Sequence, residues 1–192
     1  MEENKQIIEK VRIFVESECL KSTSHYGEEI YPCHFIPVVH YSKLLAQKLG
    51  ADEEIVELAA WLHDIGSVMK GRKDHHISGA EIAETKLKEF NYPEEKIERV
   101  KKCILAHRGS QSIPRLTKEE QIVADADALS AFDNISGLFK AAIFHEGFNQ
   151  VQARVEVRRK LLNSWQKLSA DAKKLIEHKY LAAMILLGDE LK

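Results

Sequence analysis

Apolar residues recur at every third or fourth position along most of the chain, which is the spacing of one face of an α-helix. The first such stretch covers residues 4–20, where charged residues separate the apolar positions Ile7, Val11, Phe14 and Val15. Further helices are predicted over residues 34–49, 52–65, 75–90, 93–107, 117–129, 148–166 and 170–190. No strand-like alternation of apolar and polar residues stands out, so the pattern predicts an all-α fold.

The stretch 52–65 is the most uniformly apolar part of the chain. Asp52 is a typical N-terminal cap, and Gly66 is expected to end the helix. Because few polar positions lie between them, this segment is predicted to be the buried central helix of a bundle. Irregular segments are expected on either side of it and later in the chain, at residues 21–33, 67–75 and 109–115.

The length of 192 residues fits one domain over 1–192, with a core at about 30–140 and accessory C-terminal helices at 148–192. The apolar stripe of those last helices either joins the core or pairs two chains as a homodimer. With a net charge of -2, nothing indicates a nucleic-acid polymer or a membrane as partner.

The chain has three cysteines and no CxxC pair, which predicts reduced thiols and argues against a thiolate zinc site. No signal peptide and no apolar run of membrane-spanning length is recognised, so a cytoplasmic protein is expected.

The chemistry begins with the dipeptide His63-Asp64, at the end of the apolar helix. An unpaired carboxylate in an apolar setting is costly, whereas a divalent metal accepts imidazole and carboxylate together. His34 and Asp127 lie on two other predicted helices, which can converge on this point; His40 is the alternative to His34. Two nitrogen and two oxygen ligands without a thiolate favour Mn²⁺, Fe²⁺ or Mg²⁺, with Ni²⁺, Co²⁺ and Zn²⁺ as alternatives.

These residues resemble the HD-domain metal-dependent phosphohydrolases, whose pattern is H…HD…D. The matching segments are His34 with Val38-Val39, the run LAAWLHDIG at 58–66 and the run ADADAL at 124–129. The resemblance covers about residues 34–135 and implies an all-α helical bundle of about seven to nine helices. It places the metal ligands on His34, His63, Asp64 and Asp127, with Asp125 as the rival for the last role.

Some members of that family hold a second metal through further histidines. The resemblance puts His76 and His107 at those positions, and Asp64 would then bridge the two ions. The remaining histidines are expected in solvent-exposed or structural positions: His25, His75, His145 and His178.

The resemblance implies a metal-dependent phosphohydrolase that acts on a small phosphate ester or anhydride, with nucleotides as the favoured class. One or two divalent ions would activate water. Asp64 would also orient the nucleophile, and Asp125 would orient a ligand or water from behind. The basic residues expected to hold the phosphate are Lys70, Arg72, Lys73 and Arg108.

Two other functions remain open on the same residues. A few HD-fold proteins carry a di-iron centre and use oxygen, and the same His/Asp set would serve that chemistry. A non-catalytic module that binds a metal or nucleotide for regulation is the other alternative, although the intact set of ligands argues against it.

Overall fold

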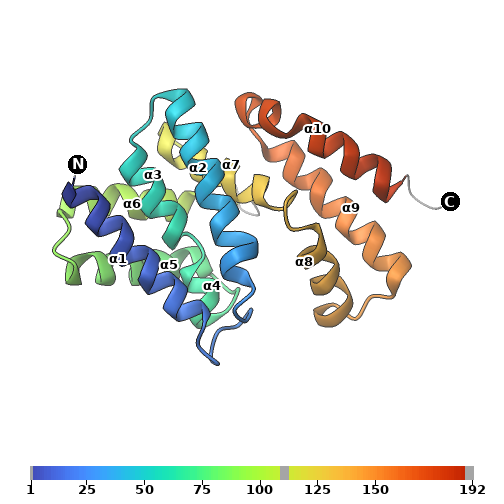
Figure 1. Ribbon diagram of the computed structural model, residues 1–192, viewed down its shortest axis with the longest axis horizontal. Helices are drawn as coiled ribbons and strands as arrows, with labels where there is room; N and C mark the ends of the chain where they lie inside the picture. The colour runs from blue at the N-terminus through green and yellow to red at the C-terminus, as the bar shows by residue number, and fades with distance from the viewer. Residues whose placement is uncertain (1, 109–112, 189–192) are drawn as a thin grey trace.

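A computed structural model of the chain describes residues 2–108 and 113–188. Over these residues the chain forms α-helices and two short π-helical segments, and no strand (Figure 1). The predicted all-α fold is therefore confirmed. In chain order the elements are α1 (Glu2–Cys19), η1 (Tyr31–Phe35), α2 (Ile36–Leu49), α3 (Glu53–Leu62), α4 (Ile65–Lys70), α5 (His75–Glu89), α6 (Glu94–Ala106), α7 (Lys118–Ser130), α8 (Ile135–Lys140), η2 (Ala141–His145), α9 (Gln150–Lys167) and α10 (Ala170–Leu187).

Helix α3 is the buried central helix that the apolar run predicts. It packs against α1, α2, α6 and α7, so its side chains are enclosed on several sides. Ile55, Leu58 and Leu62 are fully buried. The expected N-terminal cap is also confirmed, because the Asp52 carboxylate accepts a hydrogen bond from the Ile55 N–H at 3.3 Å.

The end of this helix differs from the expectation that it runs to Ile65 and stops at Gly66. Helix α3 ends at Leu62, the backbone leaves helical geometry at Asp64 (φ -110°, ψ 13°), and α4 begins at Ile65. Gly66 therefore lies inside α4, and this helix also covers the first part of the loop expected at 67–75. Its role is close packing, since a Cβ there would lie 2.3 Å from the His75 carbonyl oxygen and 2.6 Å from the Gly79 nitrogen.

The C-terminal helices α9 and α10 form a hairpin that packs against α7 (Figure 1). Asn149 and Ser169 cap the two helices, and the rings of Trp165 and Tyr180 stack between them at 4.1 Å. The preceding α8 and η2 are not predicted by the apolar pattern, because each is only one to two turns long.

Some apolar side chains of the hairpin pack into the core, and others remain on the surface. Leu161, Leu168 and Ile176 are buried, whereas Ile185 and Leu186 remain about four-fifths exposed, at 79% and 82%. No helix in the described ranges is both long enough and apolar enough to cross a bilayer. Of the irregular segment expected at 109–115, residues 109–112 lie outside the described residues.

We expect Gly66→Ala to destabilise the protein by about 1–3 kcal/mol, because the new methyl group has no space between α4 and α5. Gly79→Ala, on the facing helix, is the matched control, since its Cβ would meet its neighbours at 3.4–3.5 Å, an ordinary contact distance. Chemical denaturation of both variants measures the difference. Equal stability of the two would contradict the close-packing role of Gly66.

Candidate metal centre and its cavity

The candidate ligands come from breaks in the helices and from one regular helix. His34 lies in the π-helical turn η1, where the Ile36 N–H bonds to the Tyr31 carbonyl oxygen. Helix α2 begins directly after this turn, and Pro37 lies in its first turn, where a missing N–H is tolerated. His63 and Asp64 occupy the break between α3 and α4, and Asp127 lies on α7.

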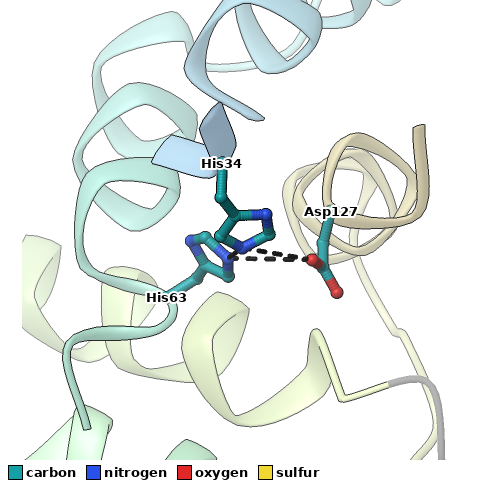
Figure 2. Close-up of side chains that lie close together, drawn as sticks. All are labelled: His34, His63 and Asp127. Carbon is teal, nitrogen blue, oxygen red and sulfur yellow. Dashed lines mark hydrogen bonds and ion pairs between the residues drawn. The ribbon is translucent and has the colours of Figure 1, made fainter. Parts of the chain in front are cut away.

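The first group of donors is His34, His63 and Asp127 (Figure 2). The Nε2 atoms of the two histidines are 3.0 Å apart. Asp127 Oδ1 lies 3.6 Å from His34 Nε2 and 3.8 Å from His63 Nε2. Three segments that are distant in sequence therefore present one donor atom each to the same point.

Asp64 connects this group to a second one. Its Oδ2 lies 3.4 Å from His34 Nε2 and 3.9 Å from His63 Nε2. Its other oxygen, Oδ1, lies 3.3 Å from His75 Nε2 and 3.7 Å from His107 Nε2, and these two nitrogens are 3.3 Å apart. The Asp64 carboxylate thus lies between two pairs of imidazoles.

All four imidazoles are oriented by their Nδ1 atoms. The oxygen partners are Ala60 O for His63 (2.8 Å), Arg72 O for His75 (2.9 Å), Ile104 O for His107 (2.6 Å) and Ser130 Oγ for His34 (3.1 Å). Since the Ser130 hydroxyl donates to the Asp127 carbonyl at 2.7 Å, its oxygen accepts from His34. With the proton on Nδ1, each Nε2 presents a lone pair, which is the form that binds a metal.

The electrostatics of this arrangement favour a cation. Four lone pairs and two carboxylates face one another, and the buried Asp64 Oδ1 accepts no hydrogen bond from the described residues. Burial lowers the pKa of His63 to about 4, so this imidazole is neutral. Burial opposes the ionisation of Asp64, but contacts with His107 and His34 outweigh it and hold the pKa of Asp64 well below its usual range. The residues present can therefore hold a metal ion.

The second group contains His75, not His76. The resemblance puts His76 at this position and leaves His75 in a solvent-exposed or structural one, whereas the structure brings His75 to the cluster. Successive residues of a helix point about 100° apart, and of these two His75 is the one that faces Asp64. His76 turns away and its Nδ1 lies 3.1 Å from Arg108 Nη1. Similarly, His34 lies in the cluster, whereas the alternative His40 is exposed.

Asp125 does not face the cluster, in contrast to its expected role of orienting a ligand or water. It lies two positions before Asp127, on another side of α7. Its Oδ1 accepts hydrogen bonds from the Gln121 side chain and from the Ser169 N–H, both at 3.0 Å. Burial raises its pKa despite these bonds. Asp125 therefore anchors the turn between α9 and α10.

A cavity of about 800 Å³ opens over the cluster, and residues of α7, α8, η2 and α9 line much of it. Of the basic residues expected to hold phosphate, Arg72 and Arg108 line it, whereas Lys70 and Lys73 are exposed and lie outside its lining. The sequence reasoning missed the basic residues that tertiary packing brings to this cavity, because no motif marks them: Arg115, Lys140, Arg159, Lys160 and Lys167.

The family model for the HD domain matches residues 32–131, which include both groups of candidate ligands. A protein from Clostridium beijerinckii is 37% identical over 101 residues, which is 50% of this chain and 62% of that protein. Ribonuclease Y from Rubrobacter xylanophilus is 31% identical over 157 residues, which is 72% of this chain and 28% of that enzyme. The chain thus spans less than two thirds of the length of these relatives.

Solved structures share the fold over nearly the whole chain. Bacillus subtilis YpgQ superposes with a TM-score of 0.74 at 23% identity, over 97% of this chain and 94% of that one. The same protein in complex with ADP gives 0.67 at 22% identity, over 91% and 90%. An HD-superfamily hydrolase from Bacillus thuringiensis gives 0.72 at 19% identity, over 96% and 94%. At these identities the likeness concerns the fold.

The presence of His75 rather than His76 in the second group of donors can be tested directly. After reconstitution with Mn²⁺, we expect His75→Ala to reduce the bound metal from about two ions per chain to about one, because a ligand of one group is lost. His76→Ala is the matched control and should keep the full amount. Elemental mass spectrometry measures the metal content of both variants and shows which histidine is needed for the second ion. Loss of metal from His76→Ala alone would contradict the geometry.

For Asp125 we expect Asp125→Ala to lower the free energy of unfolding by about 1–3 kcal/mol, because the partly buried Ser169 N–H and the Gln121 amide lose their acceptor. Asp125→Asn retains a carbonyl oxygen and should lose less. Thermal or urea unfolding measures both, and the bound metal should stay unchanged. A drop in metal content in Asp125→Asn would return this residue to the metal site.

Proposed function

Because the chain belongs to the HD domain family, we propose that it is a metal-dependent phosphohydrolase acting on a small phosphate ester or anhydride, with a nucleotide as the favoured substrate. The observation that supports this most strongly is the Asp64 carboxylate, which lies between two pairs of imidazoles at the base of a cavity. Such an arrangement suits two neighbouring cations, and paired cations suit displacement at phosphorus.

The proposed ligands divide into two sets that share one carboxylate. Asp64 Oδ2 belongs with the first set and Asp64 Oδ1 with the second; the other members are His34, His63 and Asp127 in the first, and His75 and His107 in the second. Imidazole and carboxylate donors without thiolate favour Mn²⁺, Fe²⁺ or Mg²⁺. A bound divalent ion supplies the Lewis acidity that activates water and polarises a phosphate oxygen.

The chain's own residues orient the donors and neutralise the substrate. Backbone carbonyl oxygens hold the His63, His75 and His107 rings by their Nδ1 atoms, so the donor atoms need little reorganisation. Arg72 and Arg108 line the cavity close to His75 and His107, and guanidinium groups match the geometry of phosphate oxygens. Asp64, whose pKa is held well below its usual range, would as a carboxylate also orient a water molecule for in-line attack.

The nucleotide class is supported by the size of the cavity and by one structural neighbour. A volume of about 800 Å³ falls in the range of sites that enclose small organic ligands, roughly 300–1,000 Å³. The neighbour YpgQ has been crystallised with ADP. The relatives named ribonuclease Y make a short RNA a further substrate to include in a screen.

A screen of mono-, di- and triphosphate nucleotides with Mn²⁺-loaded protein should show phosphate or pyrophosphate release. We expect Asp64→Asn to reduce kcat by more than about a hundredfold. Mutation of a residue that only hydrogen-bonds to a metal ligand already lowers metal affinity or activity about 10- to 100-fold, and Asp64 is itself a proposed ligand. Asp171→Asn, an exposed carboxylate on α10, is the control and should retain full activity.

Three results would contradict the proposal. The first is full hydrolysis by Asp64→Asn. The second is nucleotide binding without turnover under any divalent metal, which would indicate a regulatory module. The third is oxygen consumption by the iron-loaded protein in place of phosphate release, which would indicate a di-iron oxygenase.

A further inference from the structure

The basic residues that line the cavity differ in whether a carboxylate neutralises them. Lys140 pairs with Glu29, Arg159 with Glu156, Lys160 with Glu146 and Arg108 with Asp74. Within the described ranges, no carboxylate oxygen lies within 4.0 Å of the charged nitrogens of Arg72, Arg115 or Lys167, although all three line the same cavity. Cations gathered without carboxylate partners around a concave site attract an anion.

Arg115, which lies just before α7, and Lys167, the last residue of α9, both line the cavity. Asp125 links them: its Oδ1 accepts from the N–H of Ser169, two residues after Lys167, and the charge of Arg115 acts on the same carboxylate. The Arg115 Nε donates to the Ala106 carbonyl oxygen at 3.3 Å, which ties its side chain to the end of α6. The Arg115 side chain is therefore tied to α6, and the backbone that follows Lys167 is tied to α7.

The same cavity contains the candidate metal ligand Asp127 on α7. Ala124 and Asp127 both line the cavity, and residues three apart on one helix face are about 5 Å apart. Helix α9 adds Asn163 and Ser164 to the wall beside Lys167. A substrate with one anionic group at the histidine cluster can therefore place a second one at Arg115 and Lys167.

We infer that Arg115 and Lys167 form a subsite for a second anionic group of the substrate, separate from the group at the histidine cluster. This inference rests on the proposed function. It assigns specificity to the C-terminal helix α9, beyond the residues that match the HD domain, and favours phosphoanhydrides over phosphate monoesters. Asp125 acts as a positioning residue, because it holds the turn that carries Lys167.

The test compares two non-nucleotide probes, inorganic phosphate and methylenediphosphonate, which is not hydrolysed. Their Kd values are measured by calorimetry with the Mn²⁺-loaded full chain. We expect Arg115→Ala and Lys167→Ala each to weaken methylenediphosphonate binding about tenfold, the loss of one charge-assisted hydrogen bond. Phosphate binding and metal content should not change, because neither residue belongs to the histidine cluster.

Two further variants separate recognition from structure. Lys167→Arg keeps the charge and should restore most of the affinity for methylenediphosphonate. Lys174→Ala removes a lysine that is 72% exposed on the same hairpin and outside the cavity lining, and should change neither Kd.

The inference is overturned if Arg115→Ala and Lys167→Ala bind methylenediphosphonate like the unaltered protein. It is also overturned if both probes weaken equally, which would mean that the residues only support the fold. If the unaltered protein hydrolyses nucleotides but these variants keep its affinities, the subsite alone fails. If the unaltered protein binds neither probe and hydrolyses nothing, the proposed function fails with it.

Discussion

The position of the Asp64 carboxylate is the constraint on which the site depends. Each of four imidazole nitrogens lies 3.3–3.9 Å from one of its two oxygens, and the buried Oδ1 has no hydrogen-bond donor in the part of the chain that the structure describes. Such a concentration of lone pairs and negative charge is unfavourable unless a cation accompanies it. The surrounding helices are broken or bent where they carry these donors, at η1 and at the junction of α3 with α4. At these two points the backbone departs from regular α-helical geometry, and it is there that His34, His63 and Asp64 enter the cluster.

Close packing supports the second half of the cluster. Gly66 lets α4 approach the first turn of α5, and that turn carries His75. The His75 ring is oriented in turn by the carbonyl oxygen of Arg72, a residue whose side chain lines the cavity. The glycine of the HDIG segment therefore contributes to the geometry of the donors without bearing any functional group.

Helix α7 joins the candidate metal centre to the C-terminal hairpin. Asp127 turns toward the imidazoles, while Asp125, two residues earlier, binds the turn between α9 and α10. One short run of the chain thus fixes a candidate metal donor and the wall of the cavity relative to each other. Since the residues on α9 lie outside the part that matches the HD domain, relatives with the same donors can differ in the ligands they accept.

The sequence by itself determined the helical class and the buried central helix, because periodicity is a local signal. It also named five of the six converging donors: four from the H…HD…D pattern, and His107 from the resemblance to the family. It favoured His76 over His75, whereas the geometry brings His75 to the cluster, since adjacent histidines differ only in the direction that the start of α5 gives them. The role of Asp125 and the basic wall formed by Arg115 and Lys167 were decided by tertiary structure alone. Their partners lie tens of residues away, and only the packing of α9 and α10 against α7 brings them to the cavity.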